Sequence, residues 1–268
     1  MKTNSAVWIA IAGTICFSLI TLTAYYAQTK NSNTSAATTR QERDALKKVL
    51  KSTFPKVAYD QDNPSDESTI EKRSKYDQIK VLDPDVTEDS ESISSIDWES
   101  GLPALPVKQS EIVLTGNVSS ARAYLSANKS SVFSEFQIEV SEVFKNRTTR
   151  KLNRGDALFV EREGGGGIVK FANGSESWFR LSGQKMPEVG KGYLFFVSHE
   201  FPWIGKKSEL YLITAYGIEN DNVVPLDFPA GGTHPIAETY KGRKQSVLLT
   251  DLLKAVKESR PVVSGANL

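Results

Sequence analysis

The fold class is decided by the stretch SVFSEFQIEVSEVFK (Ser131–Lys145), in which apolar and polar side chains alternate with a period of two. The alternate positions from Val132 to Val140 are mainly apolar, whereas the positions between them are mainly polar. Such alternation is typical of a β-strand that has one face in a core and the other in solvent. Val143 and Phe144 break the alternation, which predicts a bulge or the end of the strand.

Further strand-like segments lie on both sides of this stretch, and turn signals separate them. Asn173-Gly174 between two apolar-containing runs is a strong hairpin signal, and Asn220-Asp221 marks another tight turn. Short strands with no helix between them predict a mainly β fold over residues 110–228, either a small, closed or nearly closed antiparallel β-barrel or a sandwich. The other predicted strands and turns are EIVLTGNVSSARAYL (111–125), a turn at 153–156, a strand at 157–161, GIVKF, SWFRL, KGYLFFVSHE (191–200), ELYLITAYGIE and NVVPLD.

The last part of the chain, residues 229–268, is predicted to be a loop followed by one helix. In SVLLTDLLKAVKES (246–259) the apolar side chains recur with the period of a helix and no longer with that of a strand. Leu249, Leu252, Leu253 and Val256 are expected to share one face. The sequence therefore predicts an amphipathic helix that packs on the barrel.

The amino-terminal segment, residues 1–27, predicts a membrane anchor. Residues 6–26 contain no charge in twenty-one positions, and a helix of that length spans roughly 30 Å, the thickness of the hydrocarbon core of a bilayer. Cleavage after Ala27 would put bulky Tyr25 where a signal peptidase prefers a small residue. We therefore expect a single-pass protein held in the cell membrane, with its carboxyl-terminal domain outside the cytoplasm. A protein secreted after signal cleavage is the alternative.

Between the anchor and the β-domain, residues 28–109 are predicted to be a polar, largely disordered linker. Residues 57–100 carry thirteen acidic and four basic side chains. Segments this polar and acidic rarely bury enough apolar surface to offset the entropy lost on ordering. The linker would then act as a tether between the bilayer and the β-domain.

Charge and cysteine content exclude several classes of function. The formal net charge of +1 gives no reason to expect a nucleic acid partner. Cys16 is the single cysteine and lies inside the apolar run, so the chain forms neither an internal disulfide nor a thiolate zinc cluster. We expect no metal and no cofactor.

Several segments also resemble a known family. The segments are IVLTGNV, AYLSANKSSVFSEFQIEVSEVFKN, GDALFVEREGG, SGQKMPEVGKGYLFFV and LITAYGIENDNVVPLD. Together they are similar to an uncharacterised family of exported bacterial proteins that is common among acidobacteria. The resemblance covers residues 111–228 and implies an exported protein with a small OB-like barrel and extra strands. It implies no activity.

The candidate catalytic residues are few. The run Gly164–Gly167 precedes strand-like Ile168-Val169, so we interpret it as a turn between strands and not as a phosphate-binding loop, which needs a helix to follow. His199 and His234 are the two histidines, and an envelope hydrolase that uses either of them is an alternative function. A metal held by both with Glu200 or Asp227 has no supporting spacing motif. Carboxylates Glu161 and Glu163, beside Arg162, are expected to form a charged, solvated strand edge.

The favoured binding site is the segment HEFPWIGKKSE (199–209), which lies between two predicted strands. Loops commonly face solvent and carry function, and here Phe201 and Trp203 stand close to Lys206 and Lys207. These four residues are the candidate site for binding an envelope protein or a glycan, although packing over an open end of the barrel is the preferred interpretation of the segment. The sequence thus favours a binding module over an enzyme.

Overall fold

A computed structural model of the chain describes part of its 268 residues. The described residues are 54–78, 82–85, 88, 90–94, 101–163, 167–181, 183–200, 207–228 and 234–259. The chain divides into two units, Met1–Val49 and Leu50–Leu268, and every described residue lies in the second. The predicted anchor, residues 6–26, thus falls outside the described residues. None of the helices in the described ranges has the length and apolar character needed to cross a bilayer.

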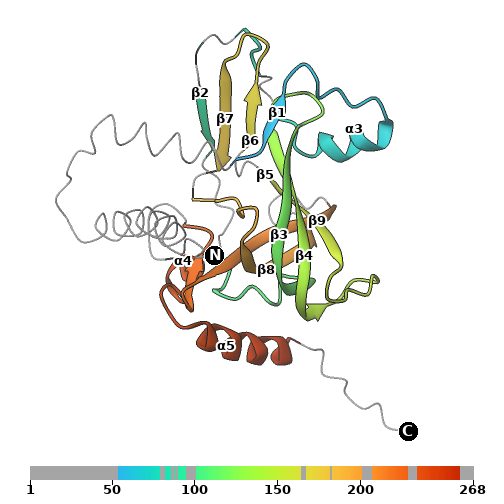
Figure 1. Ribbon diagram of the computed structural model, residues 1–268. Coiled ribbons are helices and arrows are strands. Elements are labelled where there is room, and N and C mark those ends of the chain that lie inside the picture. Colours follow the sequence, from blue (N-terminus) through green and yellow to red (C-terminus); the bar gives the residue numbers. More distant parts are fainter. Residues whose placement is uncertain are drawn as a thin grey trace, which may run out of the picture. The chain divides into compact units, whose positions relative to one another are not determined.

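Five strands pair in a closed circuit and form a barrel (Figure 1). They are β3 (Ile112–Leu125), β4 (Val132–Asn146), β5 (Ala157–Glu163), β8 (Gly192–Glu200) and β9 (Lys207–Glu219). Neighbours in the order β5, β4, β3, β8, β9 are antiparallel, and β5 meets β9 in parallel at Glu161 and Tyr211. A short strand, β10 (Asn222–Pro225), extends the sheet beyond β9. The predicted mainly β fold with antiparallel sheets is confirmed.

The alternation in β4 is confirmed, because the side chains from Val132 to Val140 on its predicted core face are all buried. The bulge is confirmed too: Val113 pairs with Lys145 and Leu114 with Val143, which leaves Phe144 as the extra residue. The barrel interior consists mainly of aliphatic and phenylalanine side chains. The buried members of this cluster are Ile112, Leu114, Val118, Phe136, Ile138, Val140, Leu152, Leu158, Val160, Met186, Tyr193, Phe195, Val197, Leu212, Ala215 and Leu226.

The predicted turns also form. The hairpin between β9 and β10 turns at Asn220 and Asp221, both with positive φ (50° and 64°), as a two-residue turn of this kind requires. The glycine run is followed by a strand, as expected, since β5 ends at Glu163 and β6 (Gly167–Lys170) begins directly after residues 164–166, which lie outside the described ranges. A Cβ atom on Gly167 would stand 1.8 Å from Cγ1 of Val132. Gly167 is thus needed for close approach of β6 to β4.

A second, four-stranded sheet has the order β1-β6-β7-β2. The antiparallel hairpin of β6 and β7 (Glu176–Leu181) is flanked in parallel by β1 (Lys56–Ala58) and β2 (Ser90–Ser94). Both flanking strands come from the segment predicted to be a disordered linker, as does α3 (Glu67–Ser74). The linker prediction is therefore wrong for residues 54–78 and 90–94. A few apolar side chains of this segment, such as Val57 and Tyr76, are buried although the average composition of the segment is acidic.

The carboxyl-terminal helix is confirmed as α5 (Gln245–Glu258), and it packs on the barrel through a core that also contains Phe196 and Tyr216. Its buried face differs from the predicted one. Leu248, Leu252 and Val256 are buried, whereas Leu253 is 57% exposed. The face has a spacing of four residues, so the helix meets the barrel along a narrow stripe.

Candidate functional site

The predicted binding loop connects β8 to β9. Phe201, Trp203 and Lys206 lie outside the described residues, and Lys207 is the first residue of β9, where it pairs with Glu200. The role predicted for these four side chains remains a prediction. What the structure adds is the end of the barrel at which this connection leaves and returns.

That end is organised around Glu111, which directly precedes β3. Its backbone carbonyl accepts a hydrogen bond from the N–H of Arg147 (2.9 Å), and its carboxylate accepts one from the N–H of His199 (3.3 Å). The imidazole Nε2 of His199 lies 3.6 Å from the same carboxylate, and both side chains are more than a third exposed. The start of β3, the end of β4 and the end of β8 therefore meet at one place.

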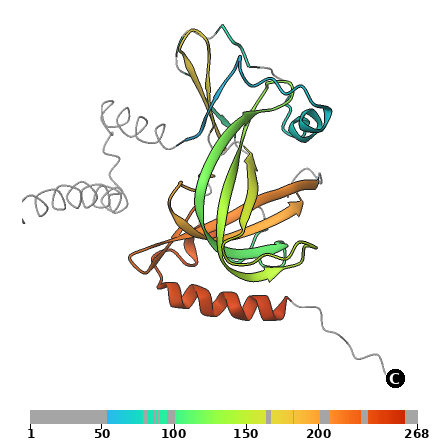
Figure 2. The ribbon, with the colours of Figure 1, turned by 45° about the vertical axis from the view of Figure 1, so that its right-hand side comes forward.

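A run of cations leads away from this place. Between Glu142 and Asp156 the chain holds five basic side chains and no acidic one. Arg147, Arg150, Lys151 and Arg154 are exposed on the connection from β4 to β5, whereas Lys145 is buried. Arg147 donates a hydrogen bond to the carbonyl of Ser259, the residue that caps α5. The connection thus lies beside the carboxyl end of α5 (Figure 2).

Lys145 holds the preceding loop in place. Its ammonium group donates to the carbonyl oxygens of Val107 and Ser110, so the segment that carries exposed Lys108 passes over the end of β4. Burial, together with the guanidinium of Arg147, lowers the pKa of Lys145 to about 8, and the carboxylate of Glu111 opposes this. The positive charges here are close enough to disfavour one another.

We call this surface the cationic end of the barrel. It comprises the exposed cations of the three segments that the bonds of Lys145 and Arg147 join, and the turn that holds Arg154 lies beside Val140 of β4. The six side chains are those of Lys108, Arg147, Arg150, Lys151, Arg154 and Lys257. The nearby carboxylates are those of Glu111, Glu142, Asp156 and Glu258. Asp156 accepts a hydrogen bond from the N–H of Asn153 (2.8 Å), and Glu111 faces His199. Within the described part of the chain, none of the six cations forms an ion pair with a carboxylate.

The two histidines serve structural roles in different elements. His234 is the N-cap of α4 (Pro235–Glu238), where its Nδ1 accepts a hydrogen bond from the N–H of Ile236 (3.2 Å), while His199 lies in β8 beside Glu111. Among the described residues there is no group of three or more His, Cys, Asp or Glu side chains that would hold a metal ion. Within the described ranges the two histidines thus lie in separate elements, β8 and α4.

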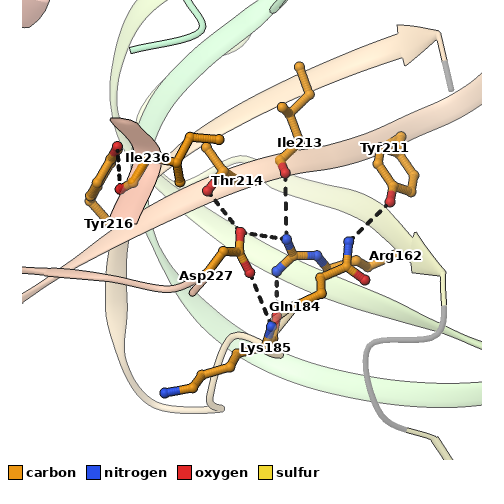
Figure 3. Close-up of polar contacts among 9 residues, drawn as sticks. All are labelled: Arg162, Gln184, Lys185, Tyr211, Ile213, Thr214, Tyr216, Asp227 and Ile236. Atoms are coloured by element: carbon orange, nitrogen blue, oxygen red, sulfur yellow. Dashed lines mark hydrogen bonds and ion pairs between the residues drawn. The ribbon is translucent and has the colours of Figure 1, made fainter. Parts of the chain in front are cut away.

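Asp227 is committed to a buried ion pair with Arg162 (Figure 3). Nη2 of Arg162 lies 2.7 Å from Oδ2 of Asp227, and both side chains are fully buried. Thr214 donates to the same oxygen (2.8 Å) and the N–H of Lys185 to the other (3.0 Å). Arg162 also donates to the carbonyl of Lys185. The network ties β5, β9 and the segment before β8 together, which is a structural role.

The expectation of a solvated strand edge around Arg162 is wrong. Glu161 is 2% exposed and Arg162 is fully buried. Nζ of Lys72 lies 3.1 Å from Oε1 of Glu161, Lys75 forms a second ion pair, and the hydroxyl of Tyr76 donates at 2.8 Å. Burial alone would raise the pKa of Glu161, but these partners outweigh it and hold the pKa below its ordinary value. The residues of 54–78 cover this edge.

Sequence reasoning missed the cationic end although the signal was present. Over the whole β-domain the charge is balanced, because residues 109–228 hold fourteen side chains of each sign. A window from residue 143 to 155 contains five cations and no acid. Lys108 and Lys257 can be assigned to the cationic end only from the fold, because both are far in sequence from the connection between β4 and β5.

Comparisons with known proteins name no relative. No protein-family model matches the chain, and neither a curated protein nor a solved structure matches it.

Proposed function

We propose that this chain is a single-pass membrane protein that presents an extracytoplasmic β-domain as a binding module of the cell envelope. The uncharged run of residues 6–26 supports the membrane anchor. The resemblance to exported bacterial proteins supports the location. The single structural observation that carries binding is the cationic end, whose six exposed basic side chains form no ion pairs among the described residues.

We further propose that the barrel is OB-like. The strand circuit β3-β4-β5-β9-β8 and the parallel contact of β5 with β9 support this, because OB-folds are five-stranded Greek-key barrels. OB-folds bind ligands over their second and third strands, here β4 and β5. In this chain Tyr76 and α3 cover part of that face. Because this face is partly covered, we expect the ligand site at the exposed end of the barrel that carries the connection from β8 to β9.

Binding is favoured over hydrolysis because the candidate catalytic side chains take part in structural contacts. Asp227 neutralises buried Arg162, and His234 caps a helix. His199 faces Glu111 at the rim of the barrel, where the carboxylate of Glu111 accepts a hydrogen bond from the N–H of His199.

The experiment that tests the function combines fractionation with crosslinking in cells. The full chain should stay in membranes through a carbonate wash, and release of a shortened chain would contradict the anchor. A photo-crosslinking residue at Trp203 or Lys151 should capture an envelope component. The same residue at exposed Arg122, on the distal half of β3, is the matched control. Equal capture from position 122, or none from 151 and 203, would contradict the proposed module.

A further inference from the structure

The cationic end has the chemistry of an anion-binding surface. Three of its six cations are arginines of one connection, Arg147, Arg150 and Arg154. A guanidinium presents a planar fork of donors that matches carboxylate, phosphate and sulfate groups, and it remains charged at every physiological pH. Arg150 is held by a hydrogen bond to the carbonyl of Ala157 (3.0 Å), and Arg147 by its bond to Ser259. Both guanidinium groups are therefore positioned by the fold.

Polar side chains surround these cations. Thr149 and Asn153 are exposed on the same connection, and Thr148 is partly exposed. The apolar member, Leu152, points into the barrel and is 8% exposed. A surface that enters a bilayer needs exposed apolar side chains among its cations. The connection from β4 to β5 offers none, and the exposed Phe159 and Leu253 lie outside it, on β5 and α5. A hydrated, charged polymer fits its chemistry better than a lipid surface does.

The cations also come from three separate segments. Lys108 precedes β3, four cations lie between β4 and β5, and Lys257 is in the last turn of α5. The fold joins these segments through the bonds of Lys145 to Val107 and Ser110 and of Arg147 to Ser259. Charges spread over several elements suit a ligand with repeated negative charges and not a single small anion.

We propose that the cationic end binds an anionic polysaccharide of the cell envelope, whose repeated acidic groups contact the arginine and lysine side chains of this surface. The inference rests on the proposed function, because it names the partner class of the same module. Lys151 and Arg154, which form no ion pair among the described residues, supply contacts that a ligand gains without breaking an existing one.

The test uses the full chain in a non-ionic detergent and measures binding by fluorescence anisotropy. The probe is labelled heparin, a linear polysaccharide with sulfate and carboxylate groups, and neutral dextran of similar length is its control. Wild-type protein should bind heparin and not dextran, and its affinity should weaken as salt is raised. The double variant Lys151→Gln/Arg154→Gln should bind about tenfold or more weakly, since two contacts of a charged ligand are lost.

The matched control removes the same charge elsewhere. Arg122→Gln/Lys170→Gln changes two exposed cations outside the cationic end and should leave affinity within about twofold. The charge-preserving variant Lys151→Arg/Arg154→Lys should retain binding. Equal loss in the control variant, unchanged binding of Lys151→Gln/Arg154→Gln, or binding to anionic lipid vesicles in place of heparin would overturn the proposal. Release of the chain from membranes would contradict the anchor while leaving this measurement unaffected.

Discussion

Tyr76 stacks on Phe133, with ring centroids 4.1 Å apart and ring planes inclined by 13°. The hydroxyl of Tyr76 donates to buried Glu161 (2.8 Å), and its carbonyl accepts a hydrogen bond from Ser131 (2.5 Å). One residue of the acidic segment thus contacts both β4 and β5. The tyrosine explains why Phe133, on the predicted solvent face of β4, is only 2% exposed.

Replacement of Tyr76 should therefore detach the covering segment. Tyr76→Ala removes a fully buried ring and should lower the free energy of unfolding by about 3 kcal/mol. Tyr76→Phe keeps the stacking and loses one hydrogen bond, so this substitution should lower the free energy of unfolding by about 1 kcal/mol. Chemical denaturation measures both, and limited proteolysis within residues 54–78 reports detachment. Equal effects of the two substitutions would show that stacking is not the main contribution.

Low pH should weaken the contacts that Glu161 makes with the covering segment. The pKa of Glu161 is lower in the folded chain than its ordinary value of 4.5, so the folded state favours the carboxylate. Its contribution to stability is complete above about pH 4.5 and is lost as the pH falls through the lowered pKa. Urea unfolding between pH 3 and pH 7 should show a steeper loss in wild type than in Glu161→Gln. Parallel pH profiles would contradict the ion pairs with Lys72 and Lys75.

The acidic segment shows why composition misled. Its average charge predicts disorder, but its fold depends on a few specific contacts. Asp62 accepts a hydrogen bond from the N–H of Leu125 (2.8 Å) and pairs with Arg73 (2.7 Å), which lies over the ring of Tyr124. The barrel supplies Leu125 and Tyr124, so no count within the segment reveals the contacts with these two residues. The strands of the barrel, by contrast, carry their own alternation and turns, and these were predictable.

Replacing one partner of the buried ion pair of Arg162 and Asp227 should strongly lower the free energy of unfolding. Asp227→Asn leaves a buried guanidinium without its counter-charge and should lower the free energy of unfolding by about 3–5 kcal/mol. Lys244→Gln is the matched control, because Lys244 and Asp221 form a pair at 3.3 Å with both side chains at least 60% exposed. Its effect should stay within about 0.5 kcal/mol. Thermal and urea unfolding measure both, and similar values would contradict the structural role of the network.

The glycine run gives a test of close packing. Gly167→Ala puts a methyl group where Cγ1 of Val132 already stands, and overpacking of this kind should lower the free energy of unfolding by about 1–3 kcal/mol. Val132→Ala opens space at the same point. The double variant should therefore be more stable than the sum of the two single effects predicts. Strict additivity, measured by urea unfolding, would show that β6 does not approach β4 at this position.

The candidate site was predictable only in part. The aromatic and basic side chains of the connection from β8 to β9 predict a candidate binding site, and the pairing of Glu200 with Lys207 confirms the strands on either side of it. Glu111 brings the end of β8 close to the end of β4, because it accepts hydrogen bonds from the N–H groups of both Arg147 and His199. Such contacts between distant segments arise from the strand circuit, and periodicity in a single segment does not contain them.

Helix α5 offers a comparison between two adjacent leucines. The predicted face included both Leu252 and Leu253, but Leu252 is fully buried and Leu253 is 57% exposed. Leu252→Ala should lower the free energy of unfolding by about 2–5 kcal/mol, because it leaves a cavity against the barrel. Leu253→Ala, its matched control, should change it by less than about 0.5 kcal/mol. Both substitutions have the same intrinsic effect on helix propensity, so the difference measured by urea unfolding isolates packing. A reversed order would mean that the helix is rotated by about one residue, with Leu253 in place of Leu252 against the barrel.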